Sequence, residues 1–300
     1  VSEVGAALKE LKELAGTTTR SQVAMIYDWD SRWAMEDSKG PRNDGLHHQE
    51  MLLKYYRAFR KQGMNVDLID MDCSIEGYQV LVLPMTYMFK QGFAEKVRAF
   101  VEQGGVLITT YWSGIADDTD RCYLGGTPHG LMDVLGLRST EIDGLFDWEE
   151  NQFMPVDGNE LGLFREYTCK YLCDLVRLDG AQALMTYGSD FYQGYPALTV
   201  NRYGKGSAWY VAADAEQVFQ EDFIAKLLEH EEICGAVPGE IPEGLEITTR
   251  ETEDVRYYIY QNFGTGRVML PLPEGETETV FGDPKQELEP YGLVVLRQRR

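Results

Sequence analysis

The chain has 300 residues, which suggests about two domains, and 44% of them are hydrophobic, enough to form a buried core. Its 28 basic and 49 acidic residues give a formal net charge of −21. This balance argues against nucleic acid or an anionic membrane as the main partner, because both select clustered positive charge. We expect no membrane span and no signal peptide. Five cysteines without a CxxC spacing predict a reducing cytoplasm.

Residues 1–15 are predicted to form an amphipathic helix. Four apolar residues recur at helical spacing: Val4, Leu8, Leu11 and Ala15. A helix with a single apolar stripe needs a partner to bury it. That partner is either this chain's next domain or a domain that the sequence does not include.

The following region alternates short apolar runs with amphipathic stretches, which predicts a parallel sheet with right-handed helical crossovers. The predicted strands are 23–27, 65–70, 78–83 and 106–111. The predicted helices are 48–62, 93–103 and a short one at 129–135, with Thr127 as its N-cap and Pro128 in its first turn. Residues 28–43 are predicted to be a polar loop.

From residue 137 onward the pattern indicates strands that are often antiparallel. These strands are 138–142, 166–172, 183–187, 197–203 and 207–212, with a tight hairpin at 203–206. A helix at 216–232 closes this region, and residues 237–244 form a linker rich in proline and glycine. The predicted strands 245–250, 256–261, 268–272, 279–281 and 292–296 indicate a small β-sandwich.

Metal chemistry has little support in the sequence. The four histidines are His47, His48, His129 and His230, and they show no HxH, HxxxH or HExxH spacing. Adjacent residues on a helix point about 100° apart, so His47 and His48 are not placed to chelate one ion. Cys169 and Cys173 are interpreted as packed thiols, with a metal or redox pair as the alternative.

Three other motifs are candidates for a catalytic or binding site. Ser113 follows a predicted strand, where hydrolases place a nucleophile, but Gly-x-Ser-x-Gly is absent, so a turn-capping serine is favoured. Residues 125–127 precede a predicted helix and offer backbone N–H groups to an anion, although a structural loop is favoured. Asp28 and Asp30 at the end of the first strand form a candidate carboxylate pair, with capping or ion pairing favoured.

Aromatic and arginine residues are dense where the predicted strands end. Trp29, Arg32, Trp33 and Arg42 follow the first strand, and Trp112 follows the fourth. The carboxyl ends of strands form the ligand crevice in open α/β sheets. Tryptophan stacks on sugar faces, and tryptophan and arginine are common interface anchors. These five residues therefore indicate a protein interface, a sugar site or core packing.

The same residues carry a family resemblance. The run from Val23 to Ala34 resembles the start of the trimerisation domain of glycoside hydrolase family 42 β-galactosidases. Further similar segments follow in the same order: 40–43, 65–67, 83–85, 100–105, 110–115 and 196–201.

This resemblance implies a flavodoxin-like, class I glutamine amidotransferase-like parallel sheet flanked by helices, followed by a small all-β sandwich domain. Residues 1–20 would be the end of a preceding barrel and a linker, 21–236 the trimerisation domain, 237–244 a linker and 245–300 the β domain. The acid/base and nucleophile glutamates of the family belong to the barrel, and no position here matches either. We therefore expect no catalytic residue, metal or cofactor in this chain.

The implied role is assembly of a homotrimer about a threefold axis, which places the catalytic barrels of the parent beside one another with each active site open toward the trimer centre. The parent resembles a retaining hydrolase of terminal β-D-galactosides, and the chain alone is expected to be inactive. Trp29, Arg32, Trp33, Arg42 and Trp112 are the candidates for the interface or for a wall near a neighbour's substrate pocket. The alternatives are a carbohydrate-binding module using strand-end tryptophans and a stand-alone amidohydrolase-like enzyme.

Overall fold

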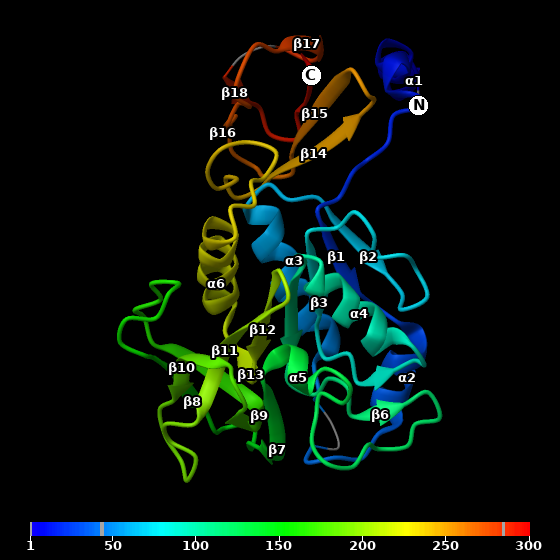
Figure 1. The fold of residues 1–300 in the computed structure, drawn as a ribbon. Helices are drawn as coiled ribbons and strands as arrows, with labels where there is room; N and C mark the ends of the chain where they lie inside the picture. Colours follow the sequence, from blue (N-terminus) through cyan, green and yellow to red (C-terminus); the bar gives the residue numbers. More distant parts are fainter. Residues whose placement is uncertain (1, 43–44, 284–285) are drawn as a thin grey trace. The chain divides into compact units, whose positions relative to one another are not determined.

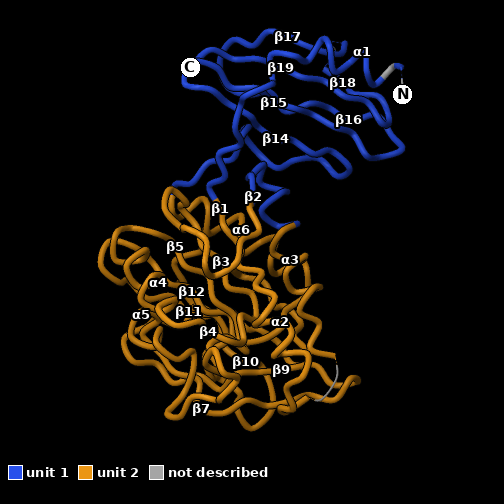
Figure 2. Tube along the Cα trace, turned by 90° about the vertical axis from the view of Figure 1, so that its right-hand side faces the viewer, with its two compact units in different colours: residues 1–22, 57–66, 232–300 blue, residues 23–56, 67–231 orange. Residues whose placement is uncertain are grey.

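The chain forms two compact units, shown in different colours in Figure 2. Residues 23–56 and 67–231 make up the α/β unit, and residues 1–22, 57–66 and 232–300 make up the β unit. The structure is a computed structural model, and the residues that it describes are 2–42, 45–283 and 286–300. Among the described helices, none combines the length and apolar character that a membrane span requires.

One large mixed sheet organises the α/β unit (Figure 1). Its strands are β1 (Val23–Ile26), β2 (Val66–Ile69), β3 (Val80–Leu83), β5 (Val106–Thr110), β7 (Leu137–Gly144), β8 (Asn151–Pro155), β9 (Tyr167–Leu178), β10 (Gln182–Tyr187), β11 (Pro196–Tyr203), β12 (Gly206–Val211) and β13 (Ala213–Ala215). Their order is β13-β9-β8-β10-β11-β12-β5-β3-β1-β2, and β7 pairs with β9.

The half of the sheet that ends in β2 is flavodoxin-like. Strands β1, β3, β5 and β12 pair in parallel, and β2 lies beyond β1. In chain order these five strands therefore lie in the sequence 2-1-3-4-5, the arrangement of doubly wound flavodoxin-like sheets. The predicted fold class is confirmed.

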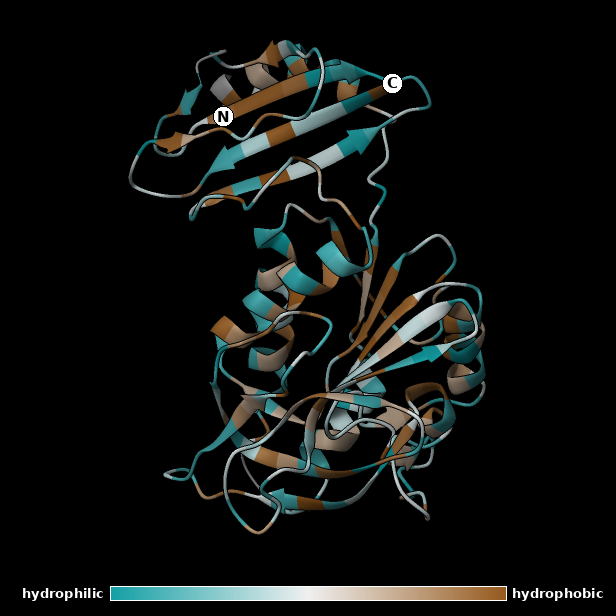
Figure 3. Cartoon of the chain, turned by 60° about the vertical axis from the view of Figure 1, so that its left-hand side comes forward, coloured by the Kyte–Doolittle hydropathy of each residue, from teal (hydrophilic) through white to brown (hydrophobic). Residues whose placement is uncertain are grey.

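Apolar runs explain why the central strands form. Every residue of β1, β3, β5 and β12 is buried, as expected of parallel strands covered on both faces. Figure 3 shows hydrophobic residues concentrated along strands, with hydrophilic ones on loops and helix surfaces. The helices of the unit are α2 (Trp29–Asp37), α3 (His48–Lys61, which ends among residues of the β unit), α4 (Phe93–Glu102), α5 (Met132–Leu135) and α6 (Gln217–His230).

The rest of the sheet is antiparallel, as predicted. The hairpin between β11 and β12 closes with Tyr203 opposite Gly206. Helix α6 packs its aromatic side chains on this part of the sheet, where Phe219 meets Phe153 of β8 edge to face at 5.2 Å. Phe223 meets Trp209 of β12 at 6.0 Å. Edge-to-face packing of buried rings adds stability beyond the area that they bury.

The β unit contains a four-stranded antiparallel sheet in the order β14-β15-β19-β17 and a two-stranded sheet of β16 and β18. Their bounds are β14 (Leu245–Glu251), β15 (Val255–Asn262), β16 (Val268–Met269), β17 (Glu278–Phe281), β18 (Glu287–Leu288) and β19 (Leu293–Arg299). Side chains of both sheets share one core, including Ile247, Tyr260, Leu288 and Val294. This agrees with the predicted small β domain.

The first helix is shorter than predicted. It spans α1 (Ser2–Glu10) and continues as a 3-10 turn, η1 (Leu11–Leu14), while Val1 lies outside the described residues. Val4 and Leu8 of the predicted stripe are exposed, so the described part of the chain does not cover them.

The predicted polar loop at 28–43 is wrong over most of its length. Asp28 caps α2, because its carboxylate accepts hydrogen bonds from the Asp30 N–H at 3.0 Å and the Ser31 N–H at 3.1 Å. An ion pair between Arg32 and Glu36, one helical turn apart, adds to the helix. Asn43, the last residue of the predicted loop, lies outside the described residues.

The predicted helix at 129–135 begins later than expected. Thr127 does not cap it, because its backbone forms a bridge with Ser139, with N···O distances of 3.2 and 2.8 Å. Helix α5 instead begins at Met132, after an N-cap at Leu131, and Pro128 lies outside its first turn. The prediction also missed several short strands: β8, β13, β18, and the parallel pair β4 (Met88–Phe89) and β6 (Ala116–Asp117).

Candidate functional site

Helix α2 displays two tryptophans to solvent. Only Ser31 and Met35 of the helix are buried, whereas Trp29 is 51% exposed and Trp33 is 59% exposed. The Met88 N–H donates to the Ser31 hydroxyl at 3.1 Å, which ties the helix to β4. Exposed indoles on an anchored helix are available for contact with another molecule.

Trp29, Arg32 and Trp33 lie together, and we call them the α2 cluster. The Arg32 guanidinium lies 5.2 Å from the centre of the Trp29 ring, and the two indole centres are 5.8 Å apart. The Tyr27 hydroxyl accepts a short hydrogen bond from Arg32, and Glu36 accepts one at 2.8 Å. These bonds fix the guanidinium, whose π-face contact stabilises the cluster.

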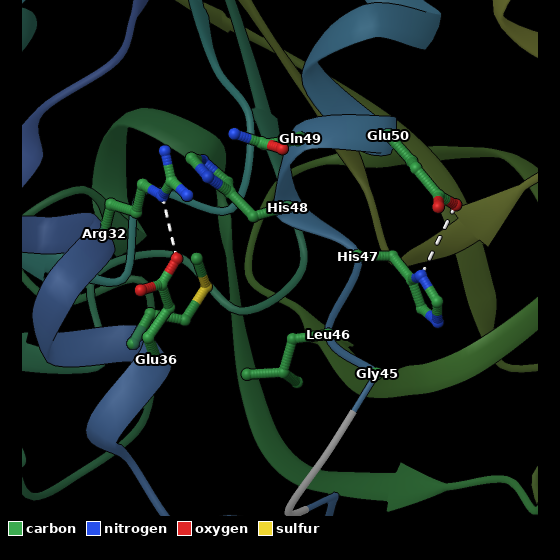
Figure 4. A pocket seen from close by; sticks show the side chains of 9 residues that line it. Arg32, Glu36, Gly45, Leu46, His47, His48, Gln49 and Glu50 are labelled. Carbon is green, nitrogen blue, oxygen red and sulfur yellow. Dashed lines mark hydrogen bonds and ion pairs between the residues drawn. The ribbon is translucent and has the colours of Figure 1, made fainter.

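A pocket of about 340 Å³ lies between α2 and the start of α3 (Figure 4). Arg32 lies beside His48 in this pocket, while His47 turns toward Glu50, with its Nδ1 3.4 Å from that carboxylate. The pKa of His48 is lowered to about 4, chiefly by desolvation and also by the nearby Arg32 charge, against a backbone hydrogen bond at Pro84 that raises it. His48 is therefore neutral near pH 7 and stacks on Tyr27 at 5.8 Å.

A second pocket opens around Lys90. The Lys90 ammonium lies 2.8 Å from Asp28, 3.0 Å from Asp30 and 3.1 Å from Asp72. Desolvation alone would lower the pKa of Lys90, but hydrogen bonds to the three carboxylates outweigh it and raise the pKa above its usual value. Asp28 and Asp30 therefore serve in capping and ion pairing, the role favoured over a catalytic carboxylate pair.

Arg42 supports the loop between β7 and β8. It donates to the Leu145 carbonyl and to the Asp147 carboxylate, both at 2.5 Å. Its guanidinium also lies 5.1 Å from the centre of the Tyr171 ring. Arg42 thus joins the chain after α2 to the loop at 145–147.

Trp112 lies in the interior, only 4% exposed, and its ring stacks on Tyr87 at 5.8 Å. Gly40 passes so close that a Cβ there would lie 2.6 Å from the indole. A residue this enclosed presents no surface to a partner in the described structure. Of the five predicted site residues, Trp29, Arg32 and Trp33 thus contact one another, whereas Arg42 bonds the loop between β7 and β8 and Trp112 packs in the interior.

The loop supported by Arg42 carries an aromatic pair that the sequence analysis missed. Phe146 and Trp148 are 61% and 77% exposed, and their rings stack nearly parallel with centres 4.8 Å apart. The Phe146 N–H donates to Glu149 Oε2 at 2.9 Å, which holds the turn. The sequence signal for this pair was the run Phe-Asp-Trp, in which two aromatic residues lie two positions apart in a polar segment.

The catalytic alternatives find no support in the geometry. Ser113 is buried and its hydroxyl accepts from the Thr86 N–H at 3.1 Å and donates to the Leu83 carbonyl at 3.4 Å, so it is a turn-capping serine. In the candidate anion loop, the Thr127 N–H donates to the Ser139 carbonyl. Cys169 and Cys173 are buried free thiols. Within residues 2–42, 45–283 and 286–300, no group of His, Cys, Asp and Glu side chains is arranged to hold a metal.

Comparison with known proteins identifies the family. The family model described as the beta-galactosidase trimerisation domain matches residues 21–234, and the beta-galactosidase C-terminal domain matches residues 244–298. The chain belongs to the family 42 β-galactosidases. The resemblance seen in the sequence is therefore confirmed.

Full-length members of the family extend well beyond this chain. Beta-galactosidase BglY of Alicyclobacillus acidocaldarius is 40% identical over 302 residues, covering 99% of this chain and 44% of the relative. Beta-galactosidase Pbg of Clostridium perfringens is 38% identical over 303 residues, covering 100% of this chain and 44% of the relative. The crystal structure of a β-galactosidase from Rahnella sp. R3 matches with a TM-score of 0.93 and 40% identity, and the match covers 99% of this chain and 44% of that one. The chain thus spans less than half the length of these relatives and represents their C-terminal part.

Proposed function

We propose that this chain is the assembly portion of a β-galactosidase and that it makes a homotrimer. The observation that carries the proposal is the match of residues 21–234 to the family's trimerisation domain. The parent protein would hydrolyse terminal β-D-galactosides with its N-terminal barrel. Each described candidate for catalysis in this chain has a structural role instead, which supports the expectation that the chain alone is inactive.

The exposed aromatic surfaces support a cyclic assembly. In a cyclic trimer each copy uses two different surfaces, because the interface is heterologous. The α/β unit offers two such surfaces, one formed by Trp29 and Arg32 of the α2 cluster and one by Phe146 and Trp148. Tryptophan, phenylalanine and arginine are enriched in interface cores. We assign these two surfaces to opposite sides of one interface, with Arg42 supporting the second.

The remaining assignments follow from the same proposal. We place the domain boundaries at 21–236 and 245–300, with 237–244 as linker, close to the two family-model matches. Trp112 contributes to internal packing, and Trp33 forms one wall of the pocket around Lys90. Five unpaired thiols support a reducing cytoplasm as the location.

Light scattering on the purified chain tests the assembly. The chain mass is 34.1 kDa, so a trimer has a mass of about 102 kDa. Trp29→Ala and Trp148→Ala, each on one of the two surfaces, should lower the mass toward that of a monomer. Phe263→Ala, an exposed aromatic residue of the β unit, is the matched control and should leave the mass unchanged. A monomeric wild-type chain at about 100 µM would refute the assembly role.

A chromogenic β-galactoside tests the second half of the proposal. The chain alone should give no turnover, because the glutamates that cleave the glycosidic bond belong to the barrel of the family. Turnover by the pure chain would show that it contains a catalytic pair and would overturn this assignment.

A further inference from the structure

The order of the parallel strands marks one place on the α/β unit for ligand binding. The chain enters the sheet at β1, moves outward to β2, and crosses back past β1 to β3. Loops that leave the carboxyl ends of β1 and β3 therefore diverge to opposite sides of the sheet. In open α/β folds the crevice between such loops is where ligands bind.

A pocket of about 540 Å³ opens at this switch point. The segments that follow β1, β2, β3 and β5 each contribute to its lining. The lining residues are Asp30, Trp33, Asp72, Met88, Lys90, Gln91 and Asp118. This volume lies within the range of small-molecule sites, about 300–1,000 Å³. The pocket belongs wholly to the α/β unit.

We propose that this pocket binds a neutral carbohydrate of one or two sugar units. Trp33 supplies an exposed indole, whose apolar face suits the C–H face of a pyranose ring. Asp30, Asp72 and Asp118 accept hydrogen bonds from hydroxyls, and Gln91 both donates and accepts. One aromatic platform beside several polar groups is the chemistry that a hydroxyl-rich ring requires.

The charges in the pocket argue against an anionic ligand and against a metal ion. Three lining carboxylates against one ammonium disfavour a phosphate or carboxylate ligand. A metal cation is disfavoured, because the Lys90 ammonium already lies 2.8–3.1 Å from the carboxylates of Asp28, Asp30 and Asp72. The first N–H groups of α2 are also occupied, because they donate to Asp28 and offer nothing to an anion. A neutral polyol is compatible with these charges.

The polar groups are held in place before any ligand arrives. Asp28 is buried, caps α2 and anchors Lys90, while Lys90 in turn orients Asp30 and Asp72. Preorganised groups lose less conformational entropy on binding. Because the pocket is open and has one aromatic wall, we expect dissociation constants on the order of millimolar.

Isothermal titration of the native chain with galactose, lactose, glucose and cellobiose tests the proposal. Trp33→Ala should weaken binding at least about tenfold, and Gln91→Ala about threefold. Trp148→Ala is the matched control, because Trp148 is an exposed tryptophan of the same unit outside the pocket lining, and it should leave the dissociation constant unchanged. Near-ultraviolet circular dichroism verifies that Trp33→Ala, at an exposed position, retains the fold.

Three outcomes would overturn the assignment: no heat with any sugar at 50 mM, equal binding by native chain and Trp33→Ala, or heat with calcium chloride or inorganic phosphate instead of sugar. The site does not depend on the proposed trimer. Light scattering on the same samples separates the pocket from the trimer, since Trp148→Ala can lower the molar mass while sugar binding persists. If the native chain is trimeric but binds no sugar, the pocket proposal is refuted and the trimer proposal stands.

Discussion

Asp174, a fully buried carboxyl group on β9, should make the stability of the α/β unit depend on pH. The Tyr210 hydroxyl donates a short hydrogen bond to its Oδ2 atom. Burial raises the pKa of Asp174 to about 7, against hydrogen bonds from Tyr210, Ser139 and the Trp112 backbone that lower it. Asp174→Asn keeps an acceptor for Tyr210 and cannot ionise.

The size of the effect follows from proton linkage. The pKa of Asp174 rises from 3.8 to about 7 on folding, and a tenfold change in proton affinity corresponds to about 1.4 kcal/mol. Because the folded pKa is the higher one, this stability is complete below pH 3.8 and is lost as the pH rises through 7. The total loss is on the order of 4 kcal/mol, of which about 3 kcal/mol falls between pH 5 and pH 8.

Urea unfolding followed by tryptophan fluorescence measures this loss. All 5 tryptophans lie in the α/β unit, so the signal reports on the unit that contains Asp174. The free energy of unfolding of the wild type relative to Asp174→Asn should fall by about 3 kcal/mol from pH 5 to pH 8. Exposed Asp157→Asn is the control and should keep the wild-type slope. A difference between wild type and Asp174→Asn that stays flat over this range would refute the reasoning.

Three further substitutions test the packing, each by the free energy of unfolding. Lys90→Met leaves the buried Asp28 carboxylate without its ammonium and should cost about 3 kcal/mol. Phe219→Ala opens a cavity among stacked rings and should cost about 3–5 kcal/mol. Asn65→Ala removes the donor to a buried threonine hydroxyl in the β unit and should cost about 1–3 kcal/mol. Exposed Phe263→Ala should change the free energy of unfolding by less than about 0.5 kcal/mol. If one of the three substitutions changes it equally little, the contact that this substitution removes does not stabilise the fold as argued.

The fold could be predicted best where local pattern and burial agree. Strands β1, β3 and β5 are short apolar runs, and buried parallel strands need only that pattern. Strand β8 was missed because Asn151–Pro155 carries polar residues and a proline, and its pairing with β9 and β10 determines its conformation. Pairing between segments distant in sequence leaves no local periodicity to detect.

Helix α2 was missed for a different reason. With only Ser31 and Met35 buried, it lacks the apolar stripe by which amphipathic helices are found. Its stability comes from the Asp28 cap and from the Arg32–Glu36 pair, both of which are visible as residue spacing. A search for capping residues followed by opposite charges four apart would have found it.

The candidate site shows where sequence reasoning ends. The sequence places Asp28, Trp33 and Lys90 after predicted strands, which is enough to assign each to the carboxyl edge of a sheet. It does not give the order of those strands, and the observed order 2-1-3 places β1 next to β3, which brings the segment after β1 beside the segment after β3. Had β3 followed β2 at the edge, Lys90 would lie two strands from Asp28, and the buried carboxylate would lack its cation. The strand order thus gathers separate polar residues around one pocket. The free energy of unfolding lost in Lys90→Met measures how much the ion pair between Lys90 and Asp28 stabilises this arrangement.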